Sequence, residues 1–252
     1  MFKKWMAIVV AMVSTMVFAL PEGATVVSGF AQVSNGVDAL LVTQNSSSLV
    51  MDWRSFNIAA HESVHCVMPS TTSVAVHRVP NAWWATQIDG TLKANGQIVL
   101  INPAGIIMSG TARIDAASFM ATTANTYGSP LDPNATWFFK SGMSSVINRG
   151  QITAQYRQQV ILLGATVINT GRIVGQGLDI FFLSGTQGLK YWHALNDPDA
   201  RIEVPAKIAL QGSNLIIAVG MPTYTNILPP AINMEGIGHT KVVDAGHSLV
   251  LR

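Results

Sequence analysis

Histidine is the residue type in this chain best suited to bind a metal ion, and the chain has six of them. His61 and His65 are four positions apart, a spacing that brings two ligands to one ion on a helix. On a strand, these two side chains would share a face but lie too far apart for a single ion. We therefore predict no metal site and expect surface or turn positions for His61, His65, His77, His193, His239 and His247.

The single cysteine and the acidic residues give little support for catalysis. Cys66 lacks the histidine and asparagine partners of a known nucleophile pattern, so we expect it to be a small buried residue. Glycosidases need two carboxylates within about 5–10 Å, and the acidic residues do not cluster in the sequence. Those considered are Asp132, Asp179, Asp197, Asp199 and Asp244. The sequence predicts no enzyme and no cofactor, although stacking of distant segments keeps an enzyme as an open alternative.

Two aromatic clusters could contact a ligand. Trp83 and Trp84 are adjacent, and a second cluster occupies residues 137–139. If these side chains were exposed, they could contact a sugar or a protein partner, whereas beneath a hairpin they would serve only in packing. The sequence favours packing for both clusters.

The N-terminus has the pattern of an export signal. Lys3 and Lys4 precede an apolar stretch, residues 5–18, that is shorter than the roughly 20 residues needed to span a membrane. We predict a signal peptide over residues 1–19, cleaved between Ala19 and Leu20, and one domain over residues 20–252. Removing the two lysines leaves 13 of the 15 basic residues against 13 acidic ones. No basic run remains, so no nucleic-acid partner is expected.

Short apolar runs bounded by turn residues recur along the rest of the chain. They occupy residues 97–101, 160–164, 178–185, 214–220 and 247–251. An Asn-Gly turn at residues 146–152 recurs 21 positions later at residues 167–173, with looser copies at 101–106 and 232–237. A repeat of this length, built from strands and turns, is typical of a solenoid.

The repeat predicts an all-β fold, a parallel β-helix. Coils of about 21 residues would stack about 4.8 Å apart, each covering the apolar face of the last. The mature chain would then make roughly ten coils. An antiparallel sandwich also uses short strands, but strict alternation of apolar and polar residues is rare here, which favours buried parallel strands.

A more specific pattern lies between residues 53 and 110. It includes Trp53, Phe56, Asn57, Ile58, Arg78, Val79, Gly90, Leu92, Asn95 and Gly96, and then Asn102, Pro103, Ala104, Gly105 and Ile106. In order and spacing these blocks resemble the N-terminal two-partner-secretion domain of filamentous-haemagglutinin-type exoproteins. The resemblance covers residues 20–124 and continues more loosely to the C-terminus.

The resemblance implies a fold, a route and partners. The fold would be a right-handed parallel β-helix with capping strands and extra hairpins. The general secretory machinery would move the chain into the periplasm, where an outer-membrane β-barrel transporter with POTRA domains would recognise it. The protein would end outside a Gram-negative cell or on its surface. Such domains often lead a long adhesin, cytolysin or toxin passenger.

The chain departs from the family pattern at three points. Ala104 replaces the second asparagine of the usual Asn-Pro-Asn-Gly-Ile block, and His77 stands where asparagine usually precedes Arg-Val. Gly105 remains, so we expect the turn to survive. Family members are often far longer, so the chain could be a fragment, the product of a truncated gene or a short member.

Two questions stay open from the sequence. Residues 102–106 could be recognised directly by the transporter or could serve only as a structural turn. The whole chain could also be a stand-alone adhesin that binds a carbohydrate or a host surface.

Overall fold

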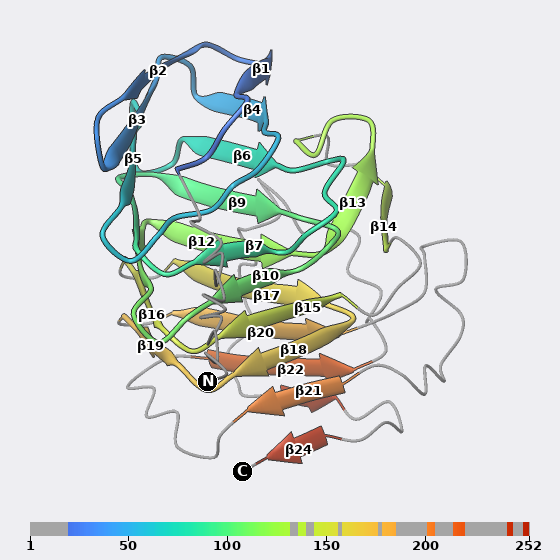
Figure 1. The fold of residues 1–252 in the computed structure, drawn as a ribbon. Helices are drawn as coiled ribbons and strands as arrows, with labels where there is room; N and C mark the ends of the chain where they lie inside the picture. Colours follow the sequence, from blue (N-terminus) through green and yellow to red (C-terminus); the bar gives the residue numbers. More distant parts are fainter. Residues whose placement is uncertain are drawn as a thin grey trace, which may run out of the picture.

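The computed structural model describes residues 20–131, 136–139, 144–155, 158–175, 178–184, 201–204, 214–219, 241–243 and 249–251. These residues form strands and turns, with no helix among them, and hence none long and apolar enough to cross a membrane. The strands build three sheets and one separate hairpin (Figure 1). The predicted signal peptide, residues 1–19, lies outside the described residues.

The first sheet is the largest. Its strands, in spatial order, are β1 (Thr25–Ser28), β4 (Ser48–Asp52), β6 (Val74–Arg78), β9 (Gln97–Ile101), β12 (Ser118–Thr122), β17 (Gln159–Gly164), β20 (Asp179–Ser184), β22 (Asn214–Val219) and β23 (Lys241–Val243). All neighbours in it pair in parallel except β1 and β4.

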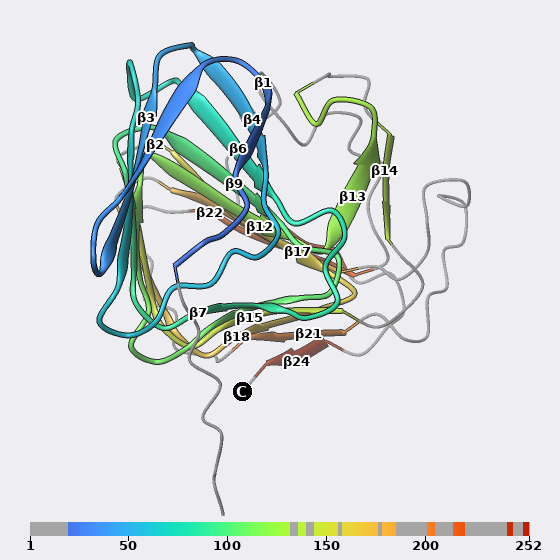
Figure 2. The same cartoon turned by 45° about the horizontal axis from the view of Figure 1, so that its top comes forward.

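Two further sheets complete the solenoid. The second contains β2 (Ala31–Asn35), β3 (Ala39–Gln44), β5 (Ser63–Val67), β8 (Thr91–Ala94), β11 (Arg113–Ala116), β16 (Gln151–Ala154) and β19 (Arg172–Val174). The third contains β7 (Thr86–Ile88), β10 (Ile106–Met108), β15 (Ser145–Asn148), β18 (Thr166–Asn169), β21 (Arg201–Val204) and β24 (Leu249–Leu251). Each complete coil runs through the first, third and second sheets, which form three sides around a common interior (Figure 2).

The predicted β-helix with capping strands and an extra hairpin is confirmed. At the N-terminal end, β1 pairs antiparallel with β4 and β2 pairs antiparallel with β3, so these strands cap the first coil. The hairpin of β13 (Ala124–Tyr127) and β14 (Thr136–Phe139) projects from the solenoid beside the first sheet (Figures 1 and 2).

The expected period of 21 residues holds only in some coils. Gln97 pairs with Ser118 and Gln159 with Asp179, offsets of 21 and 20 positions. Phe119, however, pairs with Val160, because the hairpin is inserted between β12 and β17. The hairpin lengthens this coil, and the part of the chain that the structure describes makes about six turns rather than the roughly ten expected.

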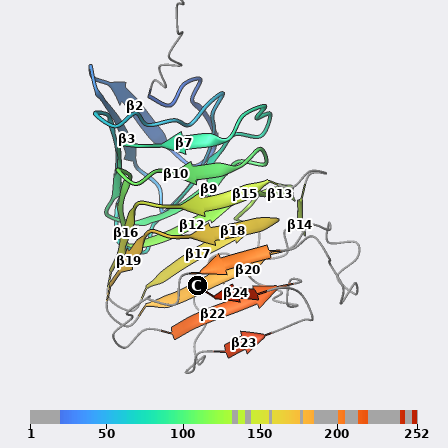
Figure 3. The same ribbon diagram turned by 60° about the horizontal axis from the view of Figure 1, so that its bottom comes forward.

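The sequence repeats correspond to stacked strands, with two corrections. Four apolar runs fall on β9, β17, β20 and β22 of the first sheet, but the fifth is β24 (Figure 3), which pairs with β21 in the third sheet (Figure 1). The Asn-Gly turns stack in register, with Asn148 opposite Asn169. The looser copy at residues 101–106 connects the first sheet to the third, whereas the turn at residues 146–152 connects the third sheet to the second. The copy at 232–237 lies outside the described residues.

Burial differs between the sheets. Every residue of β12 and of residues 159–163 in β17 is buried, so the first sheet is covered on both faces there. In the second and third sheets, strands such as β11 and β15 alternate between buried and more accessible residues. Alternation of buried and more accessible residues is therefore common in the second and third sheets, whereas the near-continuous apolar runs belong to the first sheet.

The core has two parts. Inward-facing residues of all three sheets form one large cluster that includes Phe56, Phe119 and Phe182. A second cluster lies on the outer face of the first sheet, and Leu131, from the segment between β13 and β14, packs against it. Its central row stacks in register through six strands, as Val50, Val76, Val99, Met120, Ile161 and Phe181.

Candidate functional site at one corner of the solenoid

Three blocks of the sequence pattern meet where the chain leaves the first sheet for the third. Trp53, Val79 and Asn102 each follow the last residue of a strand in that sheet, in three successive coils. Their amide groups continue the ladder: Trp53 N donates to Arg78 O at 2.7 Å, Val79 N to Ile101 O at 2.9 Å, and Asn102 N to Thr122 O at 3.0 Å. We call residues 53–58, 79–85 and 102–105 the motif corner.

The side chain of Asn102 is buried and directed into the motif corner. Its Nδ2 donates to Trp84 O at 3.1 Å and to Thr86 Oγ1 at 3.0 Å, and its Oδ1 accepts from Ala104 N at 2.8 Å. All of these partners belong to the chain itself. Asn102 therefore joins its own turn to the loop of the preceding coil and has little capacity left for an external partner.

Residues 102–105 form the turn that was expected to survive the change at Ala104. Gly105 N donates to Asn102 O at 3.0 Å, with asparagine, proline and glycine at the positions that favour such a turn. Gly105 has φ +125°, and an added Cβ would lie 3.1 Å from Ala85 Cβ. Its carbonyl accepts from Thr86 N at 2.9 Å, so the turn also starts the pairing of β10 with β7.

The first coil crosses the same corner by a shorter path. Asn57 Oδ1 accepts from Gln87 N at 2.8 Å, and Ile58 N donates to Gln87 O at 3.0 Å. Ile58 also forms a single parallel bridge with Ile88. Asn57 and Ile58 thus cover the β7 edge of the third sheet, which leaves fewer backbone groups there unpaired.

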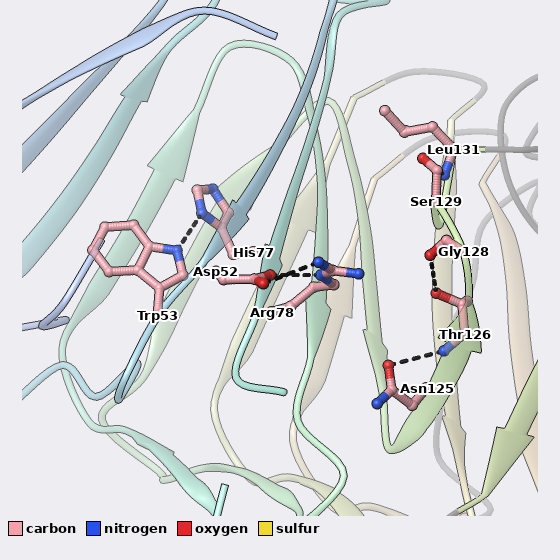
Figure 4. A network of polar contacts seen from close by, with 9 residues as sticks. All are labelled: Asp52, Trp53, His77, Arg78, Asn125, Thr126, Gly128, Ser129 and Leu131. Atoms are coloured by element: carbon pink, nitrogen blue, oxygen red, sulfur yellow. Dashed lines mark hydrogen bonds and ion pairs between the residues drawn. The ribbon is translucent and has the colours of Figure 1, made fainter. Parts of the chain in front are cut away.

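A buried histidine supports the corner from inside, contrary to the expectation that all histidines are in turns or at the surface. His77 is fully buried, and its Nδ1 accepts from Trp53 Nε1 at 3.1 Å (Figure 4). Its ring packs on Phe56 with centroids 5.2 Å apart, and its Nε2 lies 3.6 Å from Cys66 Sγ. Burial lowers the pKa of His77 from 6.5 to about 4, so the ring is neutral near pH 7.

Cys66 is buried, as expected. Loss of solvent around the thiol raises the pKa of Cys66 to about 12, because burial disfavours the thiolate. A nucleophilic cysteine needs a lowered pKa, so this arrangement of Cys66 and His77 is the opposite of an activated pair.

A hollow of about 290 Å³ opens at the motif corner, lined by residues of all three blocks and by Thr86. Trp83 and Trp84 stand at it with 89% and 81% of their surface exposed, so the prediction that this pair is packing was wrong. The signal that could have shown this is Pro80-Asn81, a turn sequence that places both tryptophans in a loop. The side chains of residues 137–139 lie outside the description.

Comparison with known proteins decides the family. The family model described as TPS secretion domain matches residues 18–221, which is most of the chain. The chain belongs to the TPS secretion domain family.

Relatives of this TPS secretion domain come from Haemophilus influenzae. A heme/hemopexin-binding protein is 34% identical over 187 residues, covering 71% of this chain and 20% of the relative. A second protein of that name is 38% identical over 86 residues, which cover 34% of this chain and 9% of that relative. The crystal structure of the HMW1 secretion domain superposes with TM-score 0.67 at 25% identity, covering 78% of this chain and 55% of that one. The chain thus spans about a fifth of the first relative.

Arg78 of the TPS secretion domain stabilises the strand that leads into the motif corner. Its Nε and Nη2 donate to the two carboxylate oxygens of Asp52 at 2.6 and 3.0 Å, across neighbouring strands (Figure 4). The Arg78 side chain is only 13% exposed. Charged groups with bidentate geometry and partial burial fix register more strongly than an exposed pair does.

Four residues of the sequence pattern lie at other places in the TPS secretion domain. Leu92 belongs to the interior core. At the corner between the second and first sheets, Asn95 Oδ1 accepts from Met68 N at 2.7 Å while its Nδ2 donates to Met68 O at 2.8 Å. Gly90 and Gly96 are at turns where a Cβ would collide with backbone of the preceding coil. These residues hold coils together but are not brought to the motif corner.

The remaining site predictions concern metals and the cleavage point. No group of three or more possible ligands occurs among the residues that the structure describes. His61 and His65 are both exposed, and the His61 ring lies 3.6 Å from the Asp38 carboxylate.

Leu20, the predicted first mature residue, packs against the interior core, whereas Ala19 is not described. His193, His239 and His247 also fall outside the description.

Proposed function

We propose that this TPS secretion domain is the export address and folding seed of a two-partner-secretion exoprotein. TPS exoproteins are secreted across the outer membrane of Gram-negative bacteria, and the proposal places this chain on that route. In it, the general secretory machinery delivers the chain to the periplasm. A dedicated outer-membrane transporter with POTRA domains then recognises it. The proposal assigns no enzymatic activity and no cofactor.

The motif corner carries this proposal. Asn102, Asn57 and Gly105 use their hydrogen bonds and backbone shape to attach one coil to a neighbouring coil. Antiparallel strands β1 and β2 cap the first coil, and the described later coils pair in parallel with the coils before them. A capped, cross-linked start provides a template on which each new coil buries the edge of the last. Folding outside the cell could then bias movement outward.

Strand addition is the recognition mode that we propose for the transporter. β2 is the end strand of the second sheet and pairs with β3 in the described part of the chain. Residues 23–37 contain no charged side chain, although edge strands are usually protected by charge. An uncharged open edge presents backbone groups that a strand of the transporter could pair with.

The test of the proposal is the amount of protein in the medium. In cells that produce the full exoprotein and its transporter, Asn102→Ala and Gly105→Ala should reduce the secreted amount severalfold. Gly110→Ala is the matched control, because nothing lies within 4 Å of a Cβ added there. Secretion of both corner variants in normal amounts would count against the proposal.

Exposure of two tryptophans favours a second candidate function. Trp83 and Trp84 present large indole surfaces to solvent beside a hollow. Exposed aromatic side chains of this kind mark contact sites for ligands or partners. The second candidate is an adhesin function, in which the domain binds a carbohydrate or a host surface through its own faces. Purified mature protein applied to a glycan array tests it.

A further inference from the structure

The hollow at the motif corner is lined by both apolar and polar side chains. Trp83 and Trp84 supply exposed aromatic surface, and the buried residues Phe56 and Val79 also line the hollow. A volume of about 290 Å³ is just below the usual range for ligand pockets, about 300–1,000 Å³. The hollow therefore accommodates a group the size of a single ring rather than a long chain.

Charge at the hollow indicates a neutral ligand. Among the described residues that line it there is no aspartate or glutamate, and Arg54 is the one cationic side chain. Arg54 forms an ion pair with Glu22, so its charge is balanced locally. A cation would find no carboxylate in the wall, and an anion would have to compete with Glu22 for the guanidinium group.

Polar groups at the hollow fall into two sets. The amides of Asn57 and Asn102 are used within the fold, as described above. Ser55 and Asn81 also line the hollow, and their side chains make no hydrogen bond to any described residue. A ligand with both an apolar ring face and hydroxyl groups would match the tryptophans and these two polar side chains.

We propose that the hollow binds one neutral saccharide unit, with a sugar ring stacked on Trp83 or Trp84. Hydroxyl groups of the sugar would hydrogen-bond to Ser55 and Asn81, and Arg54 would lie at the rim. This inference deepens the second candidate function and is independent of the export address. A proline-rich peptide is also neutral and binds aromatic grooves, but it needs an extended groove rather than a hollow for one ring.

The experiment uses the purified mature chain and the neutral methyl glycosides of glucose, galactose, mannose and N-acetylglucosamine. Saturation-transfer NMR and calorimetric titration should detect saturable binding of at least one glycoside. Binding should weaken at least tenfold in the Trp83→Ala/Trp84→Ala double variant and partly recover in the Trp83→Phe/Trp84→Phe double variant. Val37→Ala is the matched control, since Val37 is 94% exposed and does not line the hollow.

Three results would overturn the proposal. They are absence of saturable binding by all four glycosides, binding that the double variant leaves unchanged, and tryptophan-dependent binding of a proline-rich peptide without sugar binding. Urea unfolding checks that the variants are folded, and Asn81→Ala gives a second test at a polar position. Secretion is measured in parallel, so failure of the saccharide site and failure of the export address give different results.

Discussion

At the residue scale, polar side chains of the motif corner form hydrogen bonds within the fold. Asn102 is buried, and its amide bonds to backbone and side-chain groups of the preceding coil and of its own turn. A transporter that meets the folded domain cannot reach these groups without displacing them. Direct recognition of the Asn102 side chain would therefore require a chain that has not yet folded, whereas its folding role needs no such condition.

Gly105→Ala tests the backbone of this turn. We expect a loss of roughly 1–3 kcal/mol in the free energy of unfolding, because φ +125° is unfavourable for alanine and the Cβ would press on Ala85. Gly110→Ala, which meets no atom within 4 Å, should change the free energy by less than about 0.5 kcal/mol. Urea unfolding of the purified domain measures both, and equal values for the two variants would contradict the argument.

His77 should make stability depend on pH. In the described part of the chain, Trp53, Phe56 and the neutral thiol of Cys66 contact its ring, and none of these groups is a carboxylate that would stabilise a charged ring. The pKa of His77 is about 4 in the folded state, below the ordinary 6.5. Above pH 6.5 both states are neutral and stability is complete. As pH falls from 6.5 to 4 the unfolded state gains a proton first, so stability falls by up to about 3 kcal/mol.

His77→Asn is the variant that isolates this effect. Asparagine keeps a hydrogen-bond acceptor for Trp53 Nε1 and does not titrate. Unfolding in urea at pH 7.5 and pH 4.5 should show a smaller loss of stability for the variant than for the natural chain. Comparing the two proteins removes the contribution of shared carboxylates. Identical pH profiles would show that His77 is not the titrating group.

At the scale of elements, corners decide how coils attach to one another. Asn148 and Asn169 end the parallel strands β15 and β18 and are both fully buried. Asn148 Nδ2 donates to Asn169 Oδ1 at 2.7 Å, and its Oδ1 accepts from Gly150 N at 3.1 Å. This stacked pair continues the hydrogen-bond ladder around a turn, where backbone pairing is interrupted.

Asn148→Leu should weaken the junction between these two coils. The substitution leaves Asn169 Oδ1 and Gly150 N without their partner in a buried place, which costs about 1–3 kcal/mol for each such group. Thr170→Ala, at the exposed turn residue beside Asn169, is the control and should have little effect. Thermal unfolding followed by circular dichroism measures the difference, and a variant as stable as the control would rule out the ladder.

At the scale of the whole molecule, stability should differ between the first sheet and the cap. β12 is buried along its whole length, whereas four of the five residues of β2 are exposed. Amide hydrogen exchange follows local opening of the structure. Opening is easiest where apolar contacts are few and backbone groups are unpaired. We expect amides of β9, β12 and β17 to exchange slowest and those of β2 fastest. Mass spectrometry of exchanged peptides measures this, and equal protection would contradict it.

Several features could be predicted from the sequence because they depend on local pattern. Apolar runs and the repeated Asn-Gly turn predicted stacked parallel strands, since a stack repeats the same environment at each level. Asn148 and Asn169 lie in register as their spacing of 21 positions indicated. The turn at Asn102 and Gly105 was likewise predictable, because a turn depends on neighbouring residues only. The predicted transporter role of residues 102–106 remains a prediction.

Other features depended on contacts between distant residues, and only the tertiary structure decided them. Burial of His77 follows from Trp53 and Phe56 of the previous coil packing on its ring, which no local pattern contains. Trp83 and Trp84 lie exposed in the loop between β6 and β7, which is longer than the crossing in the coil before it. The length of the coil between β12 and β17 depended on the inserted hairpin, which the repeat does not indicate. Sequence determined the repeating unit, and the structure decided which side chains of successive units meet.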